Sequence, residues 1–100
     1  MFVRIARFEG GDPSNVDEVI SRVRSMMEGQ ETPAGLEDAR RSMMFVDRQT
    51  GVGLGLTFFD TEDAMRRGDQ ALNEMSPPGD MSGRRTSVEM YEVAIDRDRS

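Results

Sequence analysis

Residues 51–59 read Gly-Val-Gly-Leu-Gly-Leu-Thr-Phe-Phe, and the alternation of glycine with apolar residues favours a β-strand over a loop. A dinucleotide-binding loop requires the spacing G-x-G-x-x-G at a point where a strand turns directly into a helix. Here the glycines are two residues apart, and the strand continues to Phe59. A phosphate-binding P-loop also requires a lysine, which the chain lacks. The glycines therefore indicate a strand and not a phosphate site.

The elements on either side of this strand follow a regular order. The expected strands are residues 2–9, 36–46, 51–59 and 85–95, and the expected helices run from the caps Asp12 and Thr61 to Gly29 and Met75. A hairpin turn at residues 47–51 joins the second and third strands. This βαββαβ order predicts an α+β, ferredoxin-like fold, in which two helices cover one face of a four-stranded antiparallel sheet. We expect one domain over residues 1–96 and a charged tail at 97–100.

The RNA-recognition module has the same element order and carries base-stacking aromatic residues on its third strand. The corresponding positions here are Val52 and Leu54, and the basic residue of the motif is replaced by Thr50. The net charge of −6 also opposes binding to phosphates. We therefore expect no nucleic-acid partner.

The composition excludes several kinds of active site. The chain has no cysteine and no histidine, so it lacks thiol nucleophiles, disulfides, and the commonest general base and metal ligand. All 13 basic residues are arginine, which excludes a lysine Schiff base. We expect neither a metal nor a cofactor. No apolar run reaches the roughly 20 residues of a membrane span, and arginines interrupt the N-terminal apolar stretch, so the expected location is the cytoplasm, without a membrane partner.

The strand glycines suggest a close approach by another part of the structure. Gly53 and Gly55 point to the same side of the strand as Thr57 and Phe59. Glycine weakens a strand, so its presence suggests that a helix, a backbone or a ligand comes near. Gly68 in the second predicted helix suggests the same kind of contact. We expect close packing, so that Gly53→Val and Gly55→Val destabilise the protein; a cavity between sheet and helix is the alternative.

Both sides of the predicted sheet are apolar. Met43 and Phe45 alternate with Met44 and Val46 without a polar face, and residues 52–59 show the same pattern. Two helices cover one face of such a sheet, so the second apolar face needs another cover. The simplest cover is a second copy of the chain, packed sheet to sheet about a two-fold axis. We therefore expect a homodimer.

Three short motifs carry a resemblance to a known family: RFEG at residues 7–10, DRQTG at 47–51 and TFFDTEDAM at 57–65. Together with the element order, they make nearly the whole chain similar to the antibiotic-biosynthesis-monooxygenase-like branch of the dimeric α/β-barrel superfamily. Members of that family include cofactor-free oxygenases that act on polycyclic phenols, through an asparagine, a tryptophan and a tyrosine, and haem-degrading enzymes with a histidine ligand. This chain has neither tryptophan nor histidine.

The resemblance implies a dimeric α/β barrel, and with it a homodimer that binds a small hydrophobic or anionic molecule, with catalysis left open. One alternative is a cofactor-free monooxygenase or isomerase that acts on a phenolic or polyketide-like substrate. A packed dimer without a ligand is the other.

Two kinds of side chain are candidates for the site. Tyr91, the one tyrosine of the chain, carries a weakly acidic hydroxyl and is the candidate catalytic residue, with a packing role as the alternative. Arginines on predicted strands must pair with a carboxylate or face an opening. Arg4, Arg7 and Arg41 are of this kind, and their expected partners are Glu37, Asp38, Glu89 and Glu92. The candidate ligand-binding residues are Arg7, Arg41, Thr57, Phe59, Asn73 and Tyr91.

Overall fold

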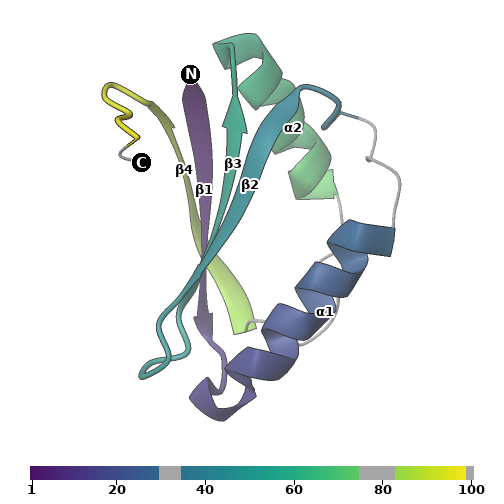
Figure 1. Cartoon of the computed structure of the whole chain (residues 1–100), viewed down its shortest axis with the longest axis vertical. Helices are drawn as coiled ribbons and strands as arrows, with labels where there is room; N and C mark the ends of the chain where they lie inside the picture. Colours follow the sequence, from purple (N-terminus) through teal and green to yellow (C-terminus); the bar gives the residue numbers. More distant parts are fainter. Residues whose placement is uncertain (30–34, 75–82, 99–100) are drawn as a thin grey trace.

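The computed structural model describes residues 1–29, 35–74 and 83–98, which form the elements labelled in Figure 1. They are β1 (Phe2–Gly10), the single 3-10 turn η1 (Pro13–Asn15), α1 (Val16–Gly29), β2 (Ala39–Val46), β3 (Gly53–Phe59), α2 (Glu62–Glu74) and β4 (Gly83–Glu92). The predicted βαββαβ order is confirmed.

The four strands form one antiparallel sheet in the order β2-β3-β1-β4. Figure 1 shows α1 and α2 on the same side of this sheet. The chain therefore has the predicted ferredoxin-like α+β fold. The first strand lies inside the sheet, where Phe2 is opposite both Phe59 on β3 and Glu92 on β4.

Two contacts identify the side of the sheet that faces the helices. Phe59 is fully buried and packs against α2, since a Cβ atom on Gly68 would lie 2.7 Å from Phe59 Cε1. Arg4 also reaches α2, with its Nε 2.7 Å from Asp69 Oδ1. We call the side that carries Arg4 and Phe59 the helix side. The opposite side, which carries the alternate residues such as Ile5, is called the open side.

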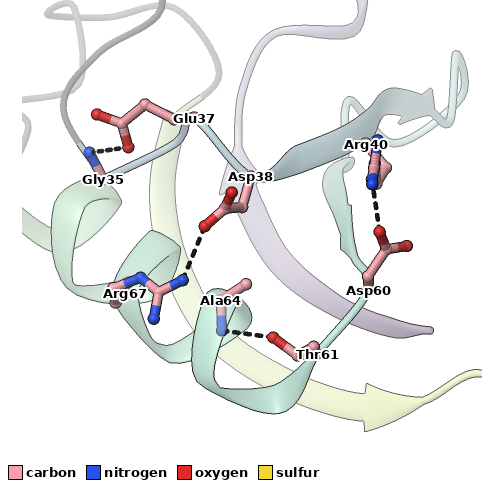
Figure 2. A network of polar contacts seen from close by, with 8 residues as sticks. All are labelled: Gly35, Glu37, Asp38, Arg40, Asp60, Thr61, Ala64 and Arg67. Atoms are coloured by element: carbon pink, nitrogen blue, oxygen red, sulfur yellow. Dashed lines mark hydrogen bonds and ion pairs between the residues drawn. The ribbon is translucent and has the colours of Figure 1, made fainter.

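The predicted cap Thr61 begins α2, whereas Asp12 caps the 3-10 turn η1 and α1 follows from Val16. The Asp12 carboxylate accepts a hydrogen bond from the Ser14 backbone N–H at 2.9 Å, and this bond lowers the pKa of Asp12. The Thr61 hydroxyl accepts from the Ala64 N–H at 3.1 Å, as Figure 2 shows. The end predicted for the second helix, Met75, lies outside the described residues. Within the described residues, neither helix has the length and apolar character of a membrane span.

The second strand starts later than predicted, at Ala39 instead of residue 36. The residues before it turn toward α2, where Asp38 pairs with Arg67 at 2.7 Å, and Figure 2 shows this pair beside the Arg40–Asp60 pair at 2.6 Å. Residues 36–38 lie beyond the end of the neighbouring strand, because Ala39 is already opposite Phe59, the last residue of β3. The last strand is Gly83–Glu92, where residues 85–95 had been predicted.

The third strand starts at Gly53 because Gly51 belongs to the hairpin turn. Gly51 has a φ of +80°, a conformation that glycine adopts without strain, and its N–H donates to the Asp47 carbonyl at 2.8 Å. The Asp47 carboxylate accepts from the N–H groups of Gln49 at 2.9 Å and Thr50 at 3.3 Å. These backbone bonds lower the pKa of Asp47.

Candidate functional site

Small residues form a flat area on the helix side of the two middle strands. Ala6 on β1 lies directly opposite Gly55 on β3, and Gly53 lies two residues along the same strand. We call these three residues the glycine floor. Small residues of this kind can allow a helix to pack closely against the sheet, or they can leave open space. The atoms above the glycine floor distinguish these two roles.

The space above Gly55 is open. No heavy atom of the described residues, its chain neighbours aside, lies within 4 Å of the position that a Cβ atom on Gly55 would occupy. A Cβ atom on Gly53 would meet the Phe45 carbonyl oxygen at 3.7 Å, an ordinary van der Waals distance. The prediction of close packing is therefore wrong for Gly53 and Gly55. It is confirmed for Gly68, where an added Cβ atom would overlap the Phe59 ring.

The first helix lies on the same side of the sheet as α2 in Figure 1, which is the side of the glycine floor. Its apolar positions are the less exposed ones: Val16 is buried and Val19, Ile20 and Val23 are half-buried. The charged residues of α1, such as Asp17 and Arg22, are exposed. The helix therefore turns an apolar stripe toward the molecule.

A buried arginine borders the glycine floor. Arg4 is 4% exposed and lies two residues before Ala6 on β1. Its Nε donates to Asp69 at 2.7 Å and its Nη2 donates to Asn73 at 3.1 Å. Asp69 and Asn73 lie one turn apart on α2, and Asn73 donates to Asp69 at 3.3 Å. The ion pair satisfies the charge of Arg4, which therefore has a structural partner.

A second arginine joins this group from β4. Arg85 Nη1 donates to Asn73 Oδ1 at 2.8 Å, the same oxygen that accepts from Arg4. In the sheet register Arg85 lies opposite Phe8, and Ala6 lies between Arg4 and Phe8, so Asn73 bridges the two arginines across the row of the glycine floor. We call Arg4, Asp69, Asn73 and Arg85 the arginine network. It contains two guanidinium groups and one carboxylate, so one positive charge is in excess.

The partner of Arg4 differs from the predicted one. The expected carboxylates were on strands or in the segment before β2, whereas the observed one, Asp69, is on α2. Asp38 pairs with Arg67 instead. A signal for Asp69 existed in the sequence, because Met65, Asp69 and Asn73 recur at four-residue spacing and Met65 is buried. Two polar residues that continue a buried helical stripe indicate a polar partner on the sheet.

The predicted ligand-binding residues lie on both sides of the sheet. Thr57, Phe59 and Asn73 lie on the helix side or on α2 facing it. By the strand register, the other three are on the open side: Arg7, Arg41 and Tyr91. Phe59 contributes to the core. The structure therefore divides the six residues between the two sides of the sheet, and on the open side it places Arg41 and Tyr91 on opposite edge strands.

Tyr91 is on the open side of β4, with 51% of its surface exposed. Its hydroxyl donates to the Glu89 carboxylate. This hydrogen bond, followed by the negative charge of Glu89, raises the pKa of Tyr91, because both favour the protonated phenol. A phenol with a raised pKa stays protonated at neutral pH and is therefore less available as a general base, and this one faces away from the glycine floor.

Comparisons with known proteins agree with the fold. No protein-family model matches the sequence, and no curated protein matches it significantly. Among solved structures, the chain is similar to a variant of SnoaB, a cofactor-independent oxygenase from Streptomyces nogalater, with a TM-score of 0.54 and 15% identity over 95% of this chain and 94% of that one. It is also similar to an antibiotic biosynthesis monooxygenase, with a TM-score of 0.52 and 15% identity over 95% of this chain and 100% of that one. The chain therefore has the ferredoxin-like fold seen in antibiotic biosynthesis monooxygenases.

Proposed function

We propose that the protein is a homodimer in which each chain binds a small, largely apolar molecule between the glycine floor and the helices. The observation that carries this proposal is the open space above Gly55. Glycine in a strand destabilises the protein. Here no described side chain or backbone comes near enough to provide a packing contact in return. Room for a ligand is a reason to keep such a residue.

The surroundings of the glycine floor favour an apolar molecule with one acidic or hydrogen-bond-accepting group. The α1 stripe and the floor itself are apolar. At one border of the floor the arginine network holds one positive charge in excess, and Arg85 is exposed. A carboxylate or phenolate on the ligand would complement that charge through the Arg85 guanidinium. A phenolic or polyketide-like molecule combines both properties.

The side chains favour binding over catalysis. A cofactor-free oxygenase needs a base to form the carbanion of its substrate. The one carboxylate of the arginine network, Asp69, is held by Arg4, and Tyr91 lies on the other side of the sheet. The alternative function, a cofactor-free monooxygenase or isomerase, is supported by the structural similarity to SnoaB, and its substrate would have to ionise with little help from the protein.

The homodimer follows from the open side of the sheet. Figure 1 shows both helices on the other side, and Phe45 and Tyr91 are among the large residues exposed on this one. A second copy of the chain would cover these apolar residues. The expected mass is about 22 kDa, twice the 11.2 kDa of the chain. Sedimentation that shows a monomer at micromolar concentration would exclude the dimer.

The binding proposal is tested by thermal shift with a panel of quinols and polyketide phenols. A ligand at about 100 times its Kd stabilises a protein by about 2.7 kcal/mol. We expect a shift for at least one compound, and loss of that shift in Gly55→Val, whose side chain occupies the space. Ser42→Val, which adds valine on the helix side of the exposed edge strand β2, should keep it. If no compound shifts the melting temperature, the packed dimer without a ligand is the better description.

The same compounds separate binding from catalysis. A compound that shifts the melting temperature and is consumed with uptake of oxygen would establish the monooxygenase. Conversion to an isomer without oxygen uptake would establish the isomerase. A compound that binds and stays unchanged supports a binding protein, which is the result we expect.

A further inference from the structure

We infer that the two copies of the proposed homodimer face each other about an axis parallel to the strands, so that Arg41 on β2 lies against Glu89 and Tyr91 on β4 of the partner. The inference rests on the homodimer of the preceding section and adds its orientation and a polar contact that fixes it. The argument uses the strand register and the charges of the open side.

The register arranges the open side as a grid of three rows, each crossing the strands in the order β2, β3, β1, β4. The first row is Arg41, Phe58, Val3 and Tyr91; the second is Met43, Leu56, Ile5 and Glu89; the third is Phe45, Leu54, Arg7 and Ser87. The middle of the grid is apolar, and apart from the buried Val3 the apolar residues of β1 and β3 are half-buried. Of the charged residues in the grid, Arg41 and Glu89 are on the edge strands, and Arg7 is on the inner strand β1, where it pairs with Glu9 at 3.4 Å.

The two edges of the grid carry opposite charges. Arg41 is exposed on the edge strand β2, and no described residue forms an ion pair with it. Glu89 is exposed on the other edge strand, β4. The Tyr91 hydroxyl donates to this carboxylate, so the aromatic ring and the carboxylate are held together. This pair offers a guanidinium both a π-face and an anion.

A two-fold axis in the plane between the sheets can run along the strands or across them. With the axis along the strands, β2 of each copy faces β4 of the other, and each row of one copy faces the same row of the other. Arg41 then lies over the partner's Tyr91 and one row from the partner's Glu89. Opposite charges meet at both edges, and the apolar centres of the first two rows face each other. Arg7 faces an apolar residue of the other copy with either axis, so the charges at the edges decide between the two.

With the axis across the strands, each strand faces its own copy. If the axis passes through the middle row, Glu89 faces the partner's Glu89 and Arg41 faces the partner's Phe45. Like charges then meet at one edge, and an arginine is covered by an apolar residue at the other. Both arrangements are unfavourable, because like charges at an interface and unpaired buried charges each weaken association. The charges therefore select the axis along the strands.

Charge reversal tests the contact. We expect Arg41→Glu and Glu89→Arg each to raise the Kd of the dimer by roughly tenfold or more, measured by sedimentation equilibrium. The double variant Arg41→Glu/Glu89→Arg should return close to the wild-type value, because the pair is restored with its signs exchanged. Arg66→Glu on the exposed face of α2 is the control and should leave the Kd unchanged. Both tested residues are exposed in the single chain, so circular dichroism should show folded variants.

The orientation has a second, independent test, since the chain contains no native cysteine. In a mixture of Arg41→Cys and Glu89→Cys chains, a short bis-maleimide should link one kind to the other. If Glu89→Cys chains link to themselves and not to Arg41→Cys chains, the orientation is wrong. A wild-type dimer that neither single reversal weakens would overturn the contact and leave the homodimer intact. A monomeric wild-type protein would overturn both.

Discussion

Replacing Gly55 with alanine should stabilise the protein, although Gly55 lies in the middle of the sheet. The added methyl group would meet no heavy atom of the described residues within 4 Å, apart from the neighbours in the chain. Gly55 is not among the glycines with a positive φ, so alanine adopts its conformation without strain. Alanine also has less conformational freedom to lose on folding. We expect a gain of about 0.5–1 kcal/mol.

The same substitution at Gly68 should have the opposite effect. Alanine is favoured over glycine in a helix by about 1 kcal/mol. Here, however, the methyl group would lie 2.7 Å from Phe59 Cε1, and Phe59 is fully buried, so its ring has no free space to move into. Overpacking of this kind costs about 1–3 kcal/mol. We expect Gly68→Ala to be destabilising by up to about 2 kcal/mol after the gain in helix propensity.

Thermal unfolding of the two variants compares these values directly. For a domain of this size, 1 kcal/mol corresponds to a change in Tm of about 4–8 °C. Gly55→Ala should therefore melt a few degrees above wild type, and Gly68→Ala below it. A clear decrease in the Tm of Gly55→Ala would refute the reasoning, since it would mean that the space above the glycine floor is filled in the folded protein.

Three further predictions concern other contacts. Asp69→Ala should destabilise the protein by about 3 kcal/mol, because it leaves the buried Arg4 without its carboxylate, whereas Asp38→Ala, which breaks the exposed pair with Arg67, should cost less than about 1 kcal/mol; similar denaturation midpoints for the two would contradict the burial argument. Thr61→Ala should cost about 1 kcal/mol through loss of the α2 cap, and Thr61→Ser should restore most of it. The lowered pKa of Asp47 implies that its carboxylate stabilises the hairpin fully above its ordinary pKa of 3.8, and that this contribution disappears as the pH falls through the lower pKa of the folded state. The difference in stability between wild type and Asp47→Ala should therefore shrink in acid; a difference that stays constant down to the lowest measurable pH would exclude this role.

Local signals were sufficient to predict the fold. The caps Asp12 and Thr61 and the turn at residues 47–51 each act through backbone atoms a few residues away, so their effect can be derived from neighbouring residues alone. The glycine strand was assigned for the same reason, since the side-chain period of a strand is local. The start of β2 differs from the predicted one because it depends on where the partner strand ends, at the Ala39–Phe59 pair, and this pairing is distant in sequence.

The candidate site was harder to predict because its members come from different elements. Arg4, Asp69 and Arg85 are widely separated in the chain, and the sequence offers several carboxylates as partners for each arginine. For the adjacent arginines Arg40-Arg41 and Arg84-Arg85, the sequence also does not predict which of the two side chains points to which side of the sheet. The sequence groups Arg7, Arg41 and Tyr91 with Asn73, whereas the sheet separates these three residues from Asn73.

An irregularity in the strand register decides to which side Arg85 points. On β4 the register shifts between Arg7 and Phe8, so that Arg85 lies opposite Phe8 on the helix side and reaches Asn73 at 2.8 Å. A regular ladder would turn Arg85 to the open side. Irregularities of this kind re-aim a side chain without ending the strand.

The shift on β2 has a different effect. It occurs between Ala39 and Arg41, and the extra residue is Arg40, which pairs with Asp60. Arg41 belongs to the regular register that starts at the hairpin, with Val46 opposite Gly53, and ends with Arg41 opposite Phe58. The hairpin therefore already places Arg41 on the open side, and the shift returns Ala39 to the helix side, opposite Phe59. A one-residue change in register reverses the sides of the residues beyond it, so the ligand site depends on the β4 bulge, which residue patterns along the chain do not reveal, whereas the dimer contact depends on the hairpin register.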